Sequence, residues 1–367
     1  MILTRVNATS FSRLLVRLPN WVGDIMMALP AIRSLRATFP EARLIGMARP
    51  EHLELARRID ALDEVMPAPP RRSRGRLRAM ANTIGELRAK HLDAAVLFAP
   101  SFEAALTVRL AGVPIRVGHA TDRRAIMLNR AVAVRKVHQS DVFQDVVSEL
   151  GGEPTDSGGG LQLADVDRRF ADDLLGTAVR RSDARPVFLN PASTKTPRAW
   201  ASDRFRILAD RLADRFPETL LLVHDRHPFD CPAGWPTSDS IRTVSGASLI
   251  ELAGVIERCS LYVGNDSGPI HLAAALGVPT VGIYGPTSPT LTSPRGAIGA
   301  VHVSVSAQFE CSPCRERFFE ECPSQPTPDE RPPCLNEVSV EMVVEAAKEV
   351  LERNATSHHR QPKAHGL

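Results

Sequence analysis

Aromatic residues and long apolar runs are both scarce in this sequence. Phe, Trp and Tyr make up 5% of the 367 residues, which argues against a surface that stacks nucleic-acid bases. No run reaches the roughly 20 apolar residues of a membrane-spanning helix. Residues 1–21 lack the apolar core and small-residue cleavage site of a signal peptide. We therefore expect a cytoplasmic protein that does not cross a membrane, and contact with a membrane surface stays open.

The sequence also lacks a large excess of charge. The formal net charge is +3, from 45 basic and 42 acidic residues, which argues against a dedicated nucleic-acid binder. The most basic stretch, residues 71–78, reads RRSRGRLR. It fits a solvated loop and helix start, or a patch for an acidic substrate or anionic lipid headgroups. The length suits two α/β domains.

Short apolar strands alternate with helical segments throughout, which predicts two parallel sheets. In the first half we expect strands at 14–18, 43–47, 92–99 and 115–118, and helices at 25–39 and 102–110. In the second half we expect strands at 187–190, 220–224, 261–263 and 279–284, and helices at 202–216 and 249–258. Residues 151–160, GGEPTDSGGG, are typical of a linker, and a polar helical stretch follows at 165–181. The predicted domains are 1–165 and 182–340, followed by a helix at 341–353 and a disordered tail at 354–367.

A Gly- and Asp-containing loop follows the strand at 261–263. It reads Gly-Asn-Asp-Ser-Gly over residues 264–268, and Pro269 then suits the first turn of a helix. Such a loop directs backbone N–H groups and a helix dipole at one point, which favours an anion flanked by Asp266 and His271. It matches neither G-x-G-x-x-G nor the P-loop. The alternative is an ordinary strand-to-helix turn, with Asp266 as a cap and His271 packed inside.

Two further loops carry candidate chemistry. After the strand at 187–190, hydroxyl groups and two cations lie on one loop, at Ser193, Thr194, Lys195 and Arg198. This combination suits a diphosphate, and the alternative is an exposed basic loop. Asp24 follows the first strand at the start of a helix, where it is either a general base or a helix cap.

Four of the six cysteines lie close together in the sequence. They are Cys311, Cys314, Cys322 and Cys334, and the first two form a C-x-x-C pair. Four thiols that begin with C-x-x-C can hold a structural zinc ion. The alternative is a Pro-rich loop with reduced thiols, since stable disulfides are rare in the cytosol.

Several of these stretches together resemble one family. Residues 18–24 (LPNWVGD), 265–279 (NDSGPIHLAAALGVP) and 284–289 (YGPTSP) are similar to motifs of glycosyltransferase family 9, the ADP-heptose:lipopolysaccharide heptosyltransferases. The cysteine group is most like that of the heptosyltransferase II branch. The resemblance covers nearly the whole chain.

The resemblance implies an α/β fold of GT-B type, with two facing Rossmann-like domains and a cleft between them. The first domain would hold a lipid A–core acceptor at the inner membrane surface, and the second would hold ADP-heptose. Heptose would pass to a heptose of the inner core with inversion and without a metal. The implied base is Asp24, and the implied donor-binding residues are Ser193, Thr194, Lys195, Arg198, Asp266, Ser267, Gly268, Pro269 and His271.

The sequence departs from the family pattern at two loops. The donor loop lacks a basic pair directly before Trp200, which leaves the phosphate contact to Lys195 or Arg198. Residues 224–229 replace an expected glycine-rich loop. One alternative is a transferase or epimerase of the same fold that uses another nucleotide sugar or acceptor, although an epimerase needs more acid–base carboxylates than Asp24 and Asp266 provide. Another is a non-enzymatic zinc module, which the low charge and few aromatics disfavour.

Overall fold

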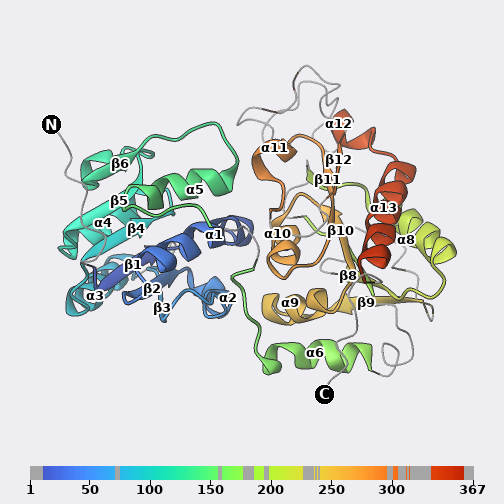
Figure 1. Cartoon of the computed structure of the whole chain (residues 1–367), viewed down its shortest axis with the longest axis horizontal. Coiled ribbons are helices and arrows are strands. Elements are labelled where there is room, and N and C mark those ends of the chain that lie inside the picture. The colour runs from blue at the N-terminus through green and yellow to red at the C-terminus, as the bar shows by residue number, and fades with distance from the viewer. Residues whose placement is uncertain are drawn as a thin grey trace. The chain divides into compact units, whose positions relative to one another are not determined.

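The chain divides into two compact units, Met1–Gln162 and Leu163–Leu367. The computed structural model describes residues 11–70, 75–155, 159–176, 186–193, 198–225, 235, 238, 240–295, 301–304, 311, 314 and 332–358. Each unit contains a six-stranded sheet in which neighbouring strands run parallel (Figure 1).

The first sheet has the order β3-β2-β1-β4-β5-β6. Its strands are β1 (Arg13–Arg17), β2 (Arg43–Ala48), β3 (Glu64–Pro67), β4 (Ala94–Leu97), β5 (Ile115–His119) and β6 (Arg130–Val132). The central strands are short apolar runs that are buried almost throughout, as expected for a parallel sheet covered on both faces.

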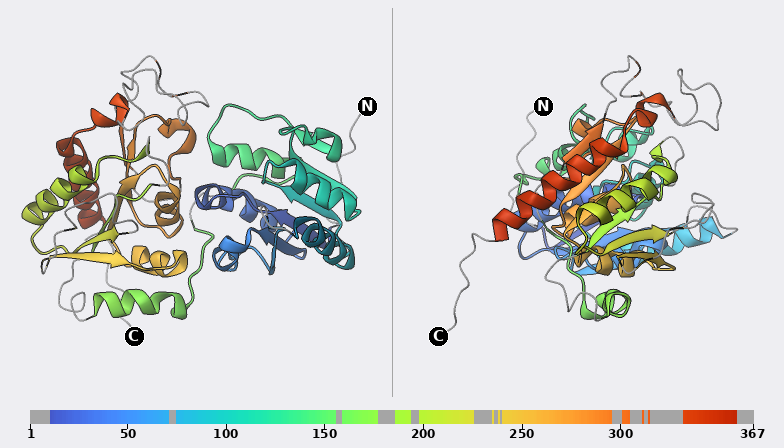
Figure 2. Two further views of the ribbon diagram at one scale, coloured as in Figure 1. Left: turned by 180° about the vertical axis from the view of Figure 1, so that it is seen from behind. Right: turned by 90° about the vertical axis from the view of Figure 1, so that its right-hand side faces the viewer.

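Helices cover both faces of the first sheet. Its helices are α1 (Val22–Thr38), α2 (Leu53–Ala56), α3 (Arg76–Ala89), α4 (Phe102–Leu110) and α5 (Gln139–Ser148), with short 3-10 turns η1 (Pro50–His52) and η2 (Arg124–Met127). Apolar residues of α3 and α4 share one core with Leu15, Ile45 and Leu97 of the strands. Helices α1 and α5 pack together on the other face (Figure 2).

The second sheet has the order β12-β11-β10-β7-β8-β9. Its strands are β7 (Val187–Asn190), β8 (Leu221–Asp225), β9 (Ile241–Ser245), β10 (Leu261–Asn265), β11 (Thr280–Tyr284) and β12 (Val301–Ser304). Its helices are α6 (Asp165–Leu175), α8 (Ser202–Arg215), α9 (Leu249–Glu257), α10 (Gly268–Ala275), α11 (Pro289–Thr292), α12 (Pro333–Asn336) and α13 (Val340–His358). Helices α8 and α13 contribute to the core on one face of the sheet.

Helix α6 belongs to the second unit. It packs on α9 so closely that a Cβ atom at Gly254 would lie 2.4 Å from the carbonyl oxygen of Asp167. Arg168 also holds Glu257 with two hydrogen bonds, of 2.6 and 2.9 Å. The second unit therefore begins before residue 182, and α13 continues to His358, beyond the expected helix end at Arg353.

The two sheets share one strand order. Counted from the first strand of each sheet, that order is 3-2-1-4-5-6, the Rossmann arrangement. In the first unit, strands β1 to β3 extend the sheet toward one edge, and β4 to β6 extend it toward the other, so the switch point lies between β1 and β4. In the second unit the switch point lies between β7 and β10. Ligands of such sheets bind at the carboxyl ends of the strands at this switch point. Among the described residues, no helix is both long and apolar enough to cross a membrane.

Candidate active site

In the second unit, a buried polar network marks the carboxyl end of β7. Asn190 is fully buried. Its side-chain amide donates to the Tyr262 hydroxyl (2.6 Å), and its Oδ1 accepts the N–H of Ala192 (3.2 Å). The Nδ1 atom of His224 lies 3.1 Å from the same Oδ1. Since buried polar groups cost free energy unless they are paired, this network fixes the direction in which the chain leaves β7.

Asn265, at the end of β10, holds both ends of the loop that follows β7. Its Nδ2 donates to the carbonyl oxygen of Pro191, and its Oδ1 accepts the N–H of Trp200, both at 2.9 Å. Asn265 is fully buried. The indole N–H of Trp200 is itself bound to the Val338 carbonyl (2.8 Å), which anchors the far end of the loop in the core.

Asp266 and Arg198 meet beside this clamp. Asp266 is 4% exposed, and its Oδ2 accepts a hydrogen bond from Thr287 Oγ1 at 2.6 Å. The same oxygen lies 3.5 Å from Nη1 of Arg198. Burial, and next the charge of Asp266, raises the pKa of the neighbouring Tyr284 hydroxyl well above its ordinary value. The guanidinium of Arg198 is therefore positioned by a buried carboxylate at the edge of the switch point.

Helix α10 begins at Gly268, two residues after Asp266. Ser267 is its N-cap residue without a side-chain capping bond, and Pro269 occupies the first turn, as the sequence predicted. Gly264 permits the approach of β10 to β7, because a Cβ there would lie 3.0 Å from the Asn190 carbonyl oxygen. The N-terminus of α10 is thus at the same sheet edge as Arg198, an arrangement that favours an anion.

The structure brings together some of the predicted donor residues. Arg198 and Asp266 are in contact, and Ser267, Gly268 and Pro269 follow directly at the start of α10. His271 is buried within this helix, and Ser193 is half-buried after β7. Thr194 and Lys195 lie outside the described residues.

Sequence reasoning missed the supporting residues Asn190, Tyr262, Asn265 and Thr287. The signal for the two asparagines was present: each is a polar residue that ends an apolar strand. Thr287 and Tyr262 gave no such signal, because their partners lie 21 and 72 residues away in the sequence.

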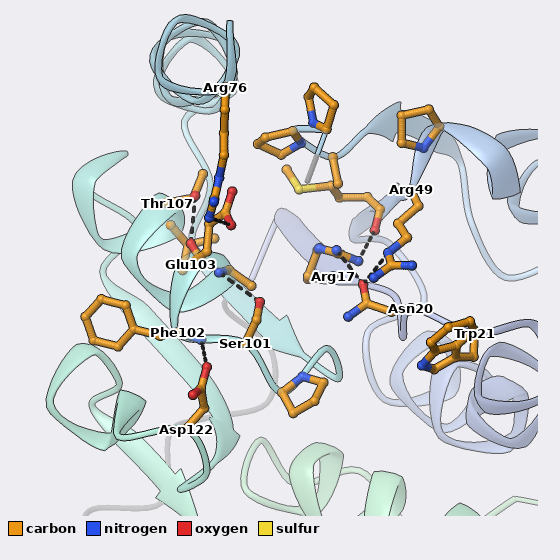
Figure 3. Close-up of a pocket in the computed structure, with 18 of the residues that line it drawn as sticks. Arg17, Asn20, Trp21, Arg49, Arg76, Ser101, Phe102, Glu103, Thr107 and Asp122 are labelled. Carbon is orange, nitrogen blue, oxygen red and sulfur yellow. Dashed lines mark hydrogen bonds and ion pairs between the residues drawn. The ribbon is translucent and has the colours of Figure 1, made fainter. Parts of the chain in front are cut away.

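The first unit contains a pocket of about 1020 Å³ at the same kind of sheet edge (Figure 3). It is lined by residues at or after the carboxyl ends of the strands, among them Arg17, Arg49, Pro69, Ser101 and Asp122. A concave site of this size at a switch point accommodates a sugar-sized ligand.

Two arginines and one asparagine form one side of this pocket. Nη2 of Arg17 and Nε of Arg49 both donate to Asn20 Oδ1, at 2.9 and 3.2 Å. Arg17 is 7% exposed, and burial, followed by the charge of Arg49, lowers the pKa of its guanidinium to about 10. Trp21 lies next to Arg49, whose Cζ is 5.6 Å from the centre of the indole ring.

Asp24 lies in the first turn of α1 and is half-buried. The N-cap residue of this helix is Trp21, so Asp24 does not occupy the cap position that the alternative interpretation assigned to it. It follows Trp21 by three residues, about one helical turn. The candidate base therefore follows the pocket residues Asn20 and Trp21 closely in the chain.

Two of the cysteines, Cys314 and Cys334, lie near the turn that follows β11. The N–H of Cys314 donates to the Pro286 carbonyl (3.0 Å), and Leu335, next to Cys334, packs on Gly285. Cys334 is buried, whereas Cys311 is half-buried. Within the described part of the chain, no group of three or more His, Cys, Asp or Glu residues is placed to hold a metal. Cys322 lies outside that part, so the four-cysteine zinc site stays a prediction.

The family model of glycosyltransferase family 9 (heptosyltransferase) matches residues 80–323. Lipopolysaccharide heptosyltransferase 2 of Escherichia coli K12 is 28% identical over 314 residues, which cover 77% of this chain and 85% of that protein.

Two solved structures have the same fold. The E. coli ADP-heptose LPS heptosyltransferase II has a TM-score of 0.74 at 22% identity, covering 94% of this chain and 99% of that one. A family 9 glycosyltransferase of Veillonella parvula has a TM-score of 0.80 at 20% identity, covering 95% and 100%. The predicted α/β fold class of GT-B type, with two Rossmann-like domains, is confirmed.

Proposed function

The chain belongs to glycosyltransferase family 9, the heptosyltransferase family, and on this premise we propose that it transfers heptose during assembly of the lipopolysaccharide core. The donor in this proposal is ADP-L-glycero-D-manno-heptose, and the acceptor is a heptose of the inner core attached to lipid A. The relatives named above support the choice of donor and acceptor.

The observation that carries the proposal is the contact of Arg198 with Asp266 at the N-terminus of α10. A nucleotide diphosphate needs cations and N–H donors where its leaving oxygen gains charge, and both converge here. Because Asp266 is buried and holds Arg198 at 3.5 Å, the guanidinium is preorganised for a phosphate. Ser193, Thr194 and Lys195 would complete the phosphate loop, and Ser267, Gly268, Pro269 and His271 the wall around the donor.

The transfer step in this proposal is a single displacement with inversion. Asp24 takes the proton of an acceptor hydroxyl, and that oxygen forms the new bond to the anomeric carbon. The bond from this carbon to the diphosphate breaks, and ADP leaves with the electron pair. Arg198 and the N–H groups of α10 stabilise the charge on ADP, so the step requires no metal.

The first unit holds the acceptor in this proposal, because Asp24, in the first turn of α1, follows the pocket residues Asn20 and Trp21 closely in the chain. The lipid portion of the acceptor would place the reaction in the cytoplasm at the inner surface of the inner membrane. The protein would then act as a peripheral enzyme.

The direct test is a transfer assay with purified protein, ADP-heptose and a core glycolipid that ends in a heptose. We expect stoichiometric release of ADP and a glycolipid heavier by one heptose in mass spectrometry. NMR of the product should show an inverted anomeric configuration. Release of ADP without transfer, or turnover only with a UDP-sugar, would contradict the assignment and favour another nucleotide-sugar enzyme of the same fold.

A further inference from the structure

We propose that Thr287 is a positioning residue of the donor site. Its hydroxyl group holds one oxygen of the Asp266 carboxylate. This bond keeps the carboxylate from forming a tight ion pair with Arg198, and it fixes the other carboxylate oxygen for a hydroxyl group of the donor sugar. The inference rests on the proposed function and deepens it, because it names the residue that sets the geometry of the donor contacts.

The first observation is a short hydrogen bond to a buried carboxylate. Thr287 Oγ1 donates to Oδ2 of Asp266 at 2.6 Å, and the two residues are 8% and 4% exposed. A hydrogen bond to an ionised acceptor is about twice as strong as one between neutral groups. Thr287 is also β-branched, which restricts the rotation of its hydroxyl-bearing side chain. The bond therefore fixes the carboxylate plane of Asp266.

The second observation is that the contact of the same oxygen with Arg198 is longer. Oδ2 of Asp266 lies 3.5 Å from Nη1 of Arg198, whereas a direct charge-assisted N–H···O bond measures about 2.7–2.9 Å. A buried carboxylate needs a direct hydrogen-bond donor, and Thr287 supplies it. Without that donor, the carboxylate would draw the guanidinium closer. A guanidinium in a tight pair with a carboxylate binds a phosphate less well.

The main chain of Asp266 is fixed as firmly as its side chain. Its N–H donates to the carbonyl oxygen of Ile283, at the end of β11, at 3.2 Å. With the main chain and Oδ2 both held, the place of Oδ1 is determined. Within the described residues, no group donates a hydrogen bond to Oδ1. A carboxylate oxygen repels a diphosphate but accepts a hydrogen bond from a hydroxyl group, so its partner would be the sugar of the donor.

The third observation is that the turn that carries Thr287 is held from two sides. A Cβ atom at Gly285 would lie 2.9 Å from the Cβ atom of Leu335, so this segment packs directly on the turn. The carbonyl oxygen of Pro286 accepts the N–H of Cys314 at 3.0 Å. Both contacts immediately precede Thr287 in the chain. The segments at Cys314 and Leu335 therefore support the position of the Thr287 hydroxyl.

The test is calorimetric titration of the full-length protein with ADP and with ADP-heptose, at a temperature where each variant is folded. Thr287→Val should weaken binding of ADP-heptose at least about tenfold, since a charge-assisted bond is lost, and binding of ADP by a smaller factor. A loss of packing alone would not separate the two ligands. Thr287→Ser keeps the hydroxyl group and should bind both ligands nearly as well as the wild type.

Thr280→Val is the matched control. Thr280 begins β11, at the end of the strand opposite to the turn, and it is fully buried. Its hydroxyl oxygen has no hydrogen-bond partner among the described residues. This variant makes the same chemical change in the same strand, so both affinities should equal those of the wild type.

A double variant tests whether Thr287 acts through Asp266. In an Asp266→Ala background, Thr287→Val should cause no further loss of ADP-heptose affinity, because both substitutions remove the same contact. An equal loss in both backgrounds would overturn the inference, and so would wild-type affinities in Thr287→Val. If Thr287→Val does not fold, Thr287→Ala undergoes the same comparison.

The titrations also separate this inference from the proposed function. A wild-type protein that binds neither ADP nor ADP-heptose would contradict the proposed function, and the inference with it. A wild-type protein that binds both ligands and transfers heptose, while the Thr287 variants bind them equally well, would contradict the inference alone.

Discussion

Substitution of Asn265 by alanine should weaken ADP binding although Asn265 is not expected to touch the nucleotide. The variant loses the two 2.9 Å hydrogen bonds that hold the loop after β7 at Pro191 and at Trp200. Arg198 lies in this loop, two residues before Trp200. Without the clamp, the loop samples other conformations, and the apparent affinity falls with the population of the competent one.

The size of the effect follows from burial. Asn265 is 0% exposed, so its removal leaves one N–H and one carbonyl group buried without their partners. Each such group costs about 1–3 kcal/mol. We expect a destabilisation of about 2–4 kcal/mol, after partial relaxation, and a decrease in Tm on the order of 10 °C for a unit of this size. The affinity for ADP should fall at least tenfold.

Calorimetric titration with ADP, at a temperature where the variant is folded, measures the affinity, and thermal unfolding measures stability. Asn129→Ala is a matched control, because Asn129 also joins a backbone N–H and a backbone carbonyl, those of Arg116 and Pro114, in the first unit. That residue is exposed, so water replaces both bonds and ADP affinity should not change. Wild-type ADP affinity in a folded but destabilised Asn265→Ala protein would refute the clamp.

Four further predictions concern the site and the fold. Asp24→Ala should lower kcat by about 10²–10⁴-fold and leave the Kd for ADP-heptose within about threefold; near-normal turnover would remove Asp24 as the base. Arg198→Ala should weaken ADP binding by about 10–100-fold, and more than Lys195→Ala; the reverse order in calorimetry would reassign the phosphate contact. EDTA should leave the rate of transfer unchanged, and a loss that Mg²⁺ restores would mean that a metal neutralises the diphosphate. Burial lowers the pKa of His119 below its ordinary 6.5, so protons bind the unfolded chain more readily; thermal unfolding should show the first unit losing stability as pH falls below about 6.5, and His119→Gln should reduce this slope.

The central strands were predictable because they are apolar on both faces. The strand expected at 187–190 has the same bounds in the structure. The strand expected at 14–18 is shifted by one residue, and the helix expected at 202–216 ends one residue earlier. The edge strands β3, β6, β9 and β12 were missed. They are short or carry polar residues, since one edge of each faces no other strand, and so they lack the uninterrupted apolar run on which the prediction depended.

The site could be predicted from the sequence only where its residues are neighbours in the sequence. The turn at Asp266–Pro269 is a continuous motif, and its place at the start of a helix follows from its composition. The Asn265 clamp and the contact of Thr287 with Asp266 join segments that are distant in the sequence, and only the strand order brings them together. The pairing of Arg17 with Arg49 through Asn20 likewise depends on the adjacency of β1 and β2.

The most direct test of the donor assignment is calorimetric titration of the wild-type protein with ADP-heptose, ADP and UDP, without added metal. We expect both adenine ligands to bind and UDP to give no heat, with Arg198→Ala losing most of the ADP signal. Tight binding of UDP, or of none of the three, would contradict the ADP-heptose assignment even though the fold and the family would stand.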